Sequence, residues 1–584
     1  MNRSHSLAPL LIPALVGFAL AAGTPGSSSL GDPLFAWMGN GGYDARHYTI
    51  DLKISSDHKT VQGRTVMEAR ATQDLSSFNL DFGQMRVQRV LVDGARARFE
   101  HADPELTVTP AEPLRTGQAF RVQVIYAGTP GTRLPPTSAL DAVGLTPTAS
   151  GAVYASEPSR LMMIAAVNDH PADKATYSFR LTAPAREQAV ANGIYLGRRD
   201  NADGTATSYY RMDEPATTYM PTVAFGQYQR VEGGTVDGVR IRHYLAPNTA
   251  AWYQPILART PEMLRFFSAR LGRYPFREYG IITHAVPFPG ALETQTLSTF
   301  PTDFDVPLDQ LPPGYIESVY AHELAHQWFG GMVSLSDYSQ TFIHEGFAEF
   351  LGDLWWEHAY GVPLEEQVRA KYPSLLNAED SGYFERTKDQ MLAVLEDALK
   401  PDARFSAAQL AQALDLLFAG TLPARLRADI LARAPEGLST AEFIAVVAEL
   451  PFTRLGYVRR DLRELRRLLD PSVPAVRPTP APGTIRAGDD PLDQAGVYNR
   501  GEITVYALHQ RVGEAKFFEI LRAFLERHRY SIASNSDFLN VVGEFAGIEV
   551  RALVERWLFD ARVPDLPELG LEGEDRLPGA DFTP

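Results

Sequence analysis

The segment His322-Glu323-Leu324-Ala325-His326 limits the possible folds of this 584-residue chain more than any other feature. Residues four positions apart lie on one face of an α-helix, so a helical segment lets both imidazoles bind one metal ion. Glu345 follows at a spacing that fits the end of this helix, a loop and a second helix. We therefore predict two packed helices on which His322, His326 and Glu345 bind one ion, with a fourth position open to water.

Nitrogen and carboxylate ligands in this pattern are typical of catalytic zinc, and we expect one Zn²⁺ per chain. The chain has no cysteine, which excludes disulfides, thiolate metal sites and a cysteine nucleophile. Glu323 is adjacent to the first histidine, so it can reach a water molecule on the ion and act as the catalytic base. The alternative is a surface helix with two hydrogen-bonded histidines. The apolar pairs Trp328-Phe329 and Phe347-Ala348 favour a buried site instead.

Length and charge narrow the class of protein. A chain of 584 residues exceeds the size of one ordinary core, so we expect several domains. Hydrophobic residues make up 45% of the chain and charged residues 22%, which is typical of a soluble globular protein. The net charge of -16 argues against a nucleic-acid partner, because nucleic-acid-binding proteins usually present a basic face.

The N-terminus has the pattern of a secretory signal. Arg3 precedes an apolar run, and Ala19-Leu20-Ala21 provides a small-x-small cleavage site. An uncleaved membrane anchor is the alternative, but the run is shorter than the ~20 residues that a spanning helix needs and contains Pro9 and Pro13. We predict a signal peptide over residues 1–22, a secreted, periplasmic or extracellular location, and no membrane contact after cleavage.

Hydrophobic periodicity divides the rest of the chain. Polar and apolar residues alternate, as in residues 47–54, between short turns to about Val231, and this predicts antiparallel strands. Helical periodicity begins with a predicted helix at 252–271. The expected divisions are a signal peptide (1–22), an N-terminal β domain (40–235), the first part of a catalytic domain (236–382), a helical insertion with a Pro-rich linker (383–488), the C-terminal helices of the catalytic domain (489–565) and a tail (566–584).

These patterns together indicate an α+β multidomain fold. An N-terminal antiparallel β-sandwich or saddle precedes a mostly helical zinc domain, which a helical insertion interrupts. Capping-box patterns at Ser406 to Gln409 and Ser439 to Glu442 mark helix starts inside the insertion. We expect the tail to be loosely packed from Arg562 onward, because it is rich in proline.

The zinc motif and its surroundings resemble a known family. The runs from His322 to Gly330 and from Glu345 to Ala348 look like those of the aminopeptidase N family of zinc metallopeptidases, a gluzincin group that includes leukotriene A-type hydrolases. The resemblance is strongest to the shorter secreted bacterial members. It covers roughly residues 40–370 and 490–565, so the insertion is a departure. It implies an N-terminal β saddle followed by a thermolysin-like catalytic domain.

The run Gly290-Ala291-Leu292-Glu293-Thr294 resembles the family's exopeptidase motif, in which the glutamate binds the free α-amine of the substrate. A carboxylate suits this task because it forms a charge-assisted hydrogen bond with an ammonium group. The resemblance therefore implies substrate-binding roles for Glu293, Gly290 and Ala291. Leu292 and Thr294 depart from the usual motif, which has Met and Asn at these positions. Glu157 falls where the family places a second amine-binding residue.

Tyr498, in Tyr498-Asn499-Arg500-Gly501, matches the family's tyrosine that hydrogen-bonds the tetrahedral intermediate. A phenol suits this role because it donates to an oxyanion without carrying charge at neutral pH. Tyr383 is the competing candidate, since the insertion places Tyr498 unusually far from Glu345 in the sequence.

Three further residues near these motifs need an explanation. His344 stands where the family usually has Asn, and we expect it to have a structural role. Glu349 is a candidate for orienting a ligand histidine. Glu502 replaces a residue that is usually small, and the sequence does not explain it.

The resemblance implies a zinc-dependent aminopeptidase that removes N-terminal residues from peptides with a free N-terminus. We expect the protein to act as a monomer. The alternatives are a zinc hydrolase of another bond, such as the epoxide hydrolysis of the leukotriene branch, and a non-catalytic binding scaffold. The scaffold is disfavoured because the three ligands and Glu323 are all present.

Overall fold

The computed structural model of the protein describes residues 23–132, 144–286, 290–304, 311–376, 404–418, 424–433, 437–449, 481–486, 492, 494–560 and 563–569. The predicted signal peptide, most of the predicted Pro-rich linker, and Tyr383 lie outside these ranges. Within them, no helix has both the length and the apolar composition needed to cross a membrane.

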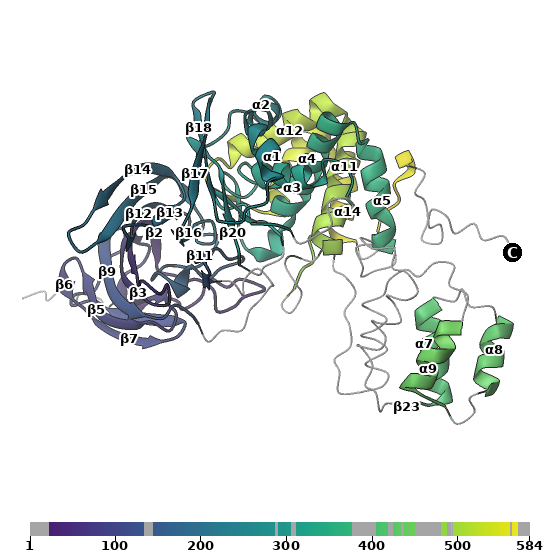
Figure 1. Ribbon diagram of the computed structural model, residues 1–584, viewed down its shortest axis with the longest axis horizontal. Coiled ribbons are helices and arrows are strands. Elements are labelled where there is room, and N and C mark those ends of the chain that lie inside the picture. The colour runs from purple at the N-terminus through teal and green to yellow at the C-terminus, as the bar shows by residue number, and fades with distance from the viewer. Residues whose placement is uncertain are drawn as a thin grey trace, which may run out of the picture.

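The N-terminal part is built from three β-sheets (Figure 1). Pairing is mostly antiparallel, as predicted, with parallel pairing between β2 and β12 and between β1 and β4. The eight-stranded sheet has the order β14 (Ile194–Asp200), β15 (Thr205–Ala216), β12 (Ala175–Pro184), β2 (Tyr43–Ile54), β3 (Val61–Ala71), β9 (Ala119–Gly128), β5 (Arg86–Val92), β6 (Ala95–Arg96). The two four-stranded sheets have the orders β1 (Thr24–Pro25), β4 (Leu75–Asp81), β8 (Glu105–Thr109), β7 (Arg98–Ala102), and β10 (Leu145–Thr148), β11 (Gly151–Tyr154), β16 (Val223–Gly226), β13 (Gln188–Ala191).

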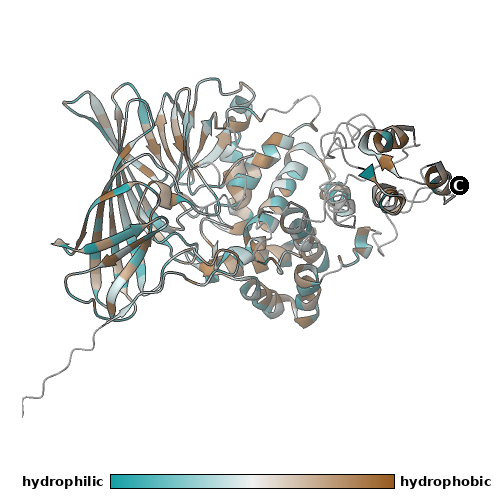
Figure 2. Ribbon diagram, turned by 90° about the horizontal axis from the view of Figure 1, so that it is seen from below, coloured by the Kyte–Doolittle hydropathy of each residue, from teal (hydrophilic) through white to brown (hydrophobic). Residues whose placement is uncertain are grey.

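Alternating burial explains why these residues form sheets. In β2 the buried residues Tyr48, Ile50 and Leu52 alternate with more exposed neighbours, so one face of the strand packs into a core. Figure 2 shows hydrophilic and hydrophobic residues mixed along these strands. The short 3₁₀ turn η1 (Leu161–Met163) lies between β11 and β12 and is largely buried.

A further sheet joins the β-rich part to the helices. Its order is β17 (Gln229–Val236), β18 (Val239–Leu245), β20 (Ile281–His284), β21 (Ser298–Pro301), with β19 (Glu278–Tyr279) also paired to β18. Its residues share one large core with the zinc-site helices. The sheet is therefore continuous with the domain that carries the metal ligands.

The rest of that domain is helical, as predicted (Figure 1). Helix α3 packs on α4, and α4 packs on α11. The helices are α1 (Tyr253–Ala258), α2 (Thr260–Leu271), α3 (Tyr315–Ala325), η3 (Tyr338–Gln340), α4 (Phe342–Tyr360), α5 (Leu364–Leu376), η4 (Gln494–Asn499), α11 (Arg500–Val512), α12 (Glu514–Arg527), α13 (Asn535–Ala546), α14 (Ile548–Phe559) and η5 (Pro567–Leu569). The short strands β22 (Ser334–Leu335) and β25 (Ile532–Ala533) pair in parallel.

Within the predicted insertion, the described residues between 404 and 449 form a small unit of their own, set apart in Figure 1. Residues 481–486 instead contact α14, where the Gly483 amide donates a 2.7 Å hydrogen bond to the Leu558 carbonyl. The small unit contains α7 (Ala407–Phe418), α8 (Ala424–Arg433) and α9 (Thr440–Glu449), with β23 (Arg404–Phe405) paired to β24 (Leu438–Ser439). Phe405 and Phe443 pack together in its interior. Both predicted capping boxes are present, since each serine and its partner three residues later exchange hydrogen bonds.

Two expectations about local structure are wrong. The helix predicted over 252–271 is split into α1 and α2 at Arg259, because Pro261 at the start of α2 has no N–H to continue the hydrogen-bond ladder. The tail is not loose immediately after Arg562. Leu566 and Leu569 are buried, and Tyr372 donates a 2.9 Å hydrogen bond to the Pro564 carbonyl.

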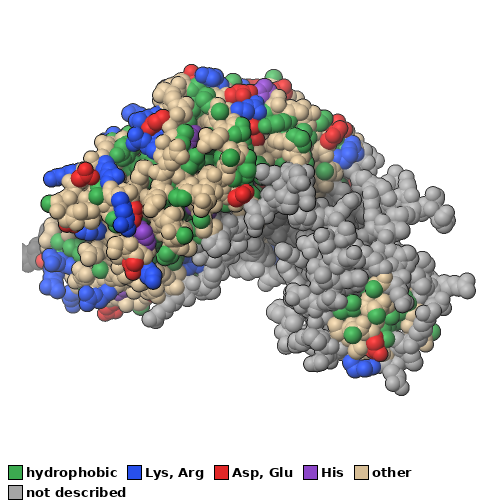
Figure 3. All heavy atoms as spheres, in the orientation of Figure 1, with side chains coloured by type: hydrophobic (Ala, Val, Ile, Leu, Met, Phe, Trp, Pro, Cys, Tyr) green, Lys and Arg blue, Asp and Glu red, His purple; other side chains and the backbone are tan. Residues whose placement is uncertain are grey.

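Charged side chains of both signs are interspersed on the described surface in Figure 3. Lys and Arg side chains are most frequent along the left edge of that face, with some Asp and Glu side chains among them.

Candidate metal and substrate site

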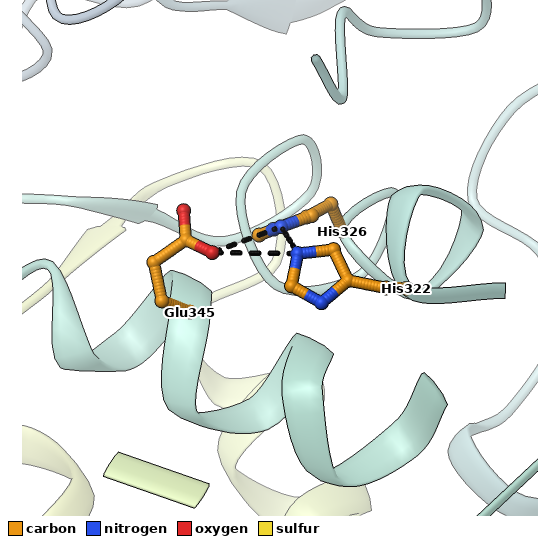
Figure 4. A group of neighbouring side chains, drawn as sticks. All are labelled: His322, His326 and Glu345. Carbon is orange, nitrogen blue, oxygen red and sulfur yellow. Dashed lines mark hydrogen bonds and ion pairs between the residues drawn. The ribbon is translucent and has the colours of Figure 1, made fainter. Parts of the chain in front are cut away.

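The three predicted metal ligands converge at the contact between α3 and α4 (Figure 4). His322 lies in the last turn of α3, His326 caps that helix, and Glu345 lies in the first turn of α4. The two histidine Nε2 atoms are 2.9 Å apart, and Glu345 Oε2 is 3.4 Å from each of them. The helix–loop–helix arrangement inferred from the spacing is therefore the one observed.

This triad fits a zinc ion. Nitrogen and oxygen ligands at ordinary zinc distances in tetrahedral geometry lie about 3.4 Å apart, close to the observed separations. Glu345 Oε2 is buried and has no hydrogen-bond partner among the described residues. Burial lowers the pKa of His326, but the carboxylates of Glu345 and Glu293 outweigh burial and raise it to about 10. The site thus favours positive charge, which a metal ion supplies.

Both imidazole rings are held from their outer edges. His326 Nδ1 is 3.0 Å from the Phe329 carbonyl, which fixes this nitrogen as the donor. His322 Nδ1 is 3.6 Å from Glu349 Oε1. Such contacts orient metal-binding histidines. The predicted candidate Glu349 accordingly lies beside His322.

Glu323 lies next to the triad without belonging to it. Its side chain is buried, and Oε2 has no hydrogen-bond partner among the described residues. Carboxylate oxygens of Glu323 and Glu293 and a nitrogen of His326 lie within 4.8 Å of one another. The orphaned oxygen can therefore accept a proton from a group held between these residues.

A second buried group adjoins the first. Oxygens of Glu157 and Glu293 and a nitrogen of His344 lie within 4.8 Å of one another. Glu157 precedes η1 in the N-terminal part, while Glu293 and His344 belong to the catalytic part. Two buried carboxylates at this separation favour a cation between them. The two residues predicted to bind the amine, Glu293 and Glu157, thus come together from both parts of the chain.

Tyr219 holds the Glu293 carboxylate. Its hydroxyl donates a 2.7 Å hydrogen bond to Glu293 Oε1 and lies 3.2 Å from His344 Nδ1. Because the single phenolic proton goes to Glu293, His344 Nδ1 must carry a proton and donate to Tyr219. Burial lowers the pKa of His344 to about 3, so the ring is neutral. The structural role expected of His344 is therefore a contact with Tyr219, beside Glu293.

Gln327 fixes the backbone of the same loop. Its Nε2 donates to the Glu293 carbonyl at 3.0 Å, and its Oε1 accepts from the Thr296 amide at 2.8 Å. Gln327 directly follows the second ligand histidine and is fully buried. One side chain thus links the zinc helix to the loop that carries Glu293.

Gly290 and Ala291 precede Glu293 in this loop. Gly290 has a φ of 104°, a left-handed conformation that favours glycine. Leu292 exchanges backbone hydrogen bonds of 2.9 and 2.8 Å with Thr299 of β21. The departure of Leu292 from the usual motif residue is therefore accommodated at a buried position beside the sheet.

Tyr498 reaches the site despite the insertion. Its ring stacks on that of His322, with centroids 6.3 Å apart and planes inclined by 7°. Burial raises the pKa of Tyr498 well above its usual value, and Glu345 raises it further, so the phenol keeps its proton. Tyr498 lies in η4, which packs on α4.

Sequence reasoning missed Tyr219 and Gln327. For Gln327 a signal existed, because it is a polar residue inside an apolar stretch next to a metal ligand. Tyr219 carried no such local signal, since its partner Glu293 is remote in sequence.

A His-His-Glu site on two packed helices, in a domain that follows a β-rich N-terminal domain, defines a gluzincin-type zinc metallopeptidase. Residues 44–220 match the Peptidase M1 N-terminal domain, and residues 257–408 match the Peptidase family M1 domain. The chain belongs to peptidase family M1.

Known proteins with similar sequences include aminopeptidases. The chain is 25% identical over 323 residues to endoplasmic reticulum aminopeptidase 1 of Homo sapiens, covering 52% of this chain and 34% of the relative. It is 26% identical over 273 residues to aminopeptidase N of Haemonchus contortus, covering 45% of this chain and 26% of the relative. The chain thus spans about a third or less of the length of these curated relatives.

A solved structure matches over its whole length. The M1 zinc metallopeptidase from Deinococcus radiodurans superposes with a TM-score of 0.67 at 25% identity, covering 92% of this chain and 99% of that one. A mutant of that peptidase was solved bound to a Tyr-Ser-Ala substrate.

Proposed function

We propose that the protein is a zinc-dependent aminopeptidase that removes N-terminal residues from peptides. One observation carries this proposal: Glu293 belongs to both buried groups, with Glu323 and His326 on one side and Glu157 and His344 on the other. A cation held by Glu293 and Glu157 therefore lies directly beside the hydrolytic site. The α-ammonium of a peptide is such a cation, and its first peptide bond follows within a few ångströms.

Each residue has a distinct task in this proposal. A bound zinc ion supplies Lewis-acid chemistry, polarising the scissile carbonyl and lowering the pKa of water. Glu323 accepts the proton of the attacking water and delivers it to the leaving amine. Tyr498 donates a hydrogen bond to the developing oxyanion. Glu293, with Glu157, fixes the ammonium group and so sets the bond that is cut.

The substrate class of the solved relative supports this function, because that peptidase was solved with a tripeptide substrate. The proposal includes secretion after cleavage of residues 1–22, a monomeric state, and no membrane contact by the mature protein. It also includes the expected division at 235, 382, 488 and 565. The sequence pattern of the N-terminus is what supports secretion.

A substrate panel tests the function. Aminoacyl fluorogenic substrates should be cleaved, and their N-acetylated forms should be cleaved about 100-fold more slowly, because acetylation removes the charge that Glu293 and Glu157 bind. A chelator should stop cleavage and added zinc should restore it. Equal cleavage of acetylated and free substrates would contradict an exopeptidase. Epoxide hydrolysis without peptide cleavage would favour the leukotriene-type alternative, and no turnover of any substrate by zinc-loaded protein would favour a binding scaffold.

Replacing Glu293 with Gln should lower kcat/KM for free aminoacyl substrates by about 30-fold, since a charged hydrogen bond to the ammonium group is lost. The variant keeps the size of the side chain and can still accept from Tyr219. Steady-state kinetics measures the change, and Glu232→Gln on β17 is the exposed control. An unchanged kcat/KM would remove Glu293 from amine binding.

A further inference from the structure

A buried charged cluster lies on the far edge of the His322 ring from the other ligands. Glu349 Oε1 is 3.6 Å from His322 Nδ1, and Glu349 Oε2 accepts a 2.9 Å hydrogen bond from Lys371 Nζ. The same ammonium group donates to Asp353 Oδ2 at 2.9 Å and to Glu502 Oε2 at 2.5 Å. The Lys371 ammonium therefore lies among three carboxyl groups, one of which faces a zinc ligand.

The cluster joins three helices that are distant in sequence. Glu349 and Asp353 lie one turn apart on α4, Lys371 lies on α5, and Glu502 lies on α11, beyond the insertion. The side chain of Glu502 is 0% exposed and that of Lys371 is 16% exposed. Solvent thus screens these contacts only weakly. The cluster is built into the core that carries the zinc helix.

Charge explains why the members depend on one another. The carboxylates of Glu349 and Asp353 share one helix face and repel each other unless a cation lies between them. Burial raises the pKa of Glu502 well above its usual value, and the Asp353 carboxylate raises it further, so the cluster favours the neutral form of this carboxyl. Its other oxygen can still accept from Lys371. The neutral carboxyl thereby fixes Lys371 without adding an unpaired charge to the core.

We infer that Lys371, anchored by Glu502 and Asp353, is a positioning residue that holds Glu349 against His322 and thereby stabilises zinc binding. This inference gives Glu502 a role that the sequence alone leaves unexplained. It rests on the proposed zinc-dependent function only through the expected change in turnover. Outer contacts of this kind typically change metal affinity 10- to 100-fold, and Lys371 acts one residue further out than Glu349.

Zinc competition with a chromogenic chelator tests the inference on the full chain. Lys371→Met should raise the zinc dissociation constant about tenfold and lower kcat while KM stays within about twofold. Glu502→Gln should remain near the unaltered protein, because its amide can still accept from Lys371 and donate to Asp353. Lys53→Met is the matched control, since Lys53 forms a surface ion pair with Asp203.

The measured zinc dissociation constant does not depend on which substrate the protein cleaves. A folded Lys371→Met protein, verified by circular dichroism, that binds zinc as tightly as the unaltered protein would overturn the inference. If Lys371→Met does not fold, Glu502→Ala decides, with an expected threefold increase in the zinc dissociation constant; an unchanged constant overturns the inference. Absence of aminopeptidase activity would defeat the proposed function but leave the affinity result interpretable.

Discussion

Replacing Glu323 with Gln is expected to lower kcat by about 10³-fold while the protein keeps its zinc. The amide has the same size as the carboxyl but cannot accept the proton of the attacking water. Glu323 is not one of the three converging ligands, so metal content should not change. Steady-state kinetics on a free aminoacyl substrate and zinc analysis of the purified variant measure the two effects.

The environment of Glu323 bears on its proposed role as the base. Burial raises the pKa of its carboxyl to about 8, and the charges of His322 and His326 act in the opposite direction. A cation bound by the triad would lower this pKa and so favour the ionised carboxylate that a catalytic base needs. Glu365→Gln, at an exposed position on α5, should retain full turnover. Retained turnover in Glu323→Gln would show that another group takes the proton.

Local spacing was sufficient to predict the zinc triad. His322, His326 and Glu345 are separated by distances that one helix, one loop and the next helix determine, so their meeting follows from helical geometry. The antiparallel strands could be predicted for the same reason, since alternation is a local pattern. The division of the predicted 252–271 helix does not follow from hydrophobic periodicity, because it depends on Pro261, which begins a new helix.

The supporting contacts could not be predicted because they depend on tertiary packing. Tyr219 meets Glu293 from a different part of the chain, and Lys371 meets Glu502 across the insertion. Neither pair has a sequence spacing that helix or strand geometry would fix. The resemblance implies an amine-binding role for Glu293, but it does not identify the residue that holds this carboxylate.

Replacing Tyr498 with Phe is expected to lower kcat by about 10²-fold and to leave KM and zinc content nearly unchanged. The substitution removes only the hydroxyl, so the ring can still stack on His322. A donor used only in the transition state affects kcat and kcat/KM equally. Steady-state kinetics on the same aminoacyl substrate measures kcat and KM separately, and zinc analysis of the purified variant measures its metal content.

The position of Tyr498 beside the predicted zinc ligands is the reason to expect the lower kcat. The ring lies against a zinc ligand, and burial keeps the phenol protonated and able to donate. Tyr506→Phe removes a hydroxyl from the same helical region, at α11, and serves as the matched control. A Tyr498→Phe variant with unaltered kcat would mean that the oxyanion donor is another residue, and Tyr383 would be the next to test. A change in KM alone would instead assign Tyr498 to substrate binding.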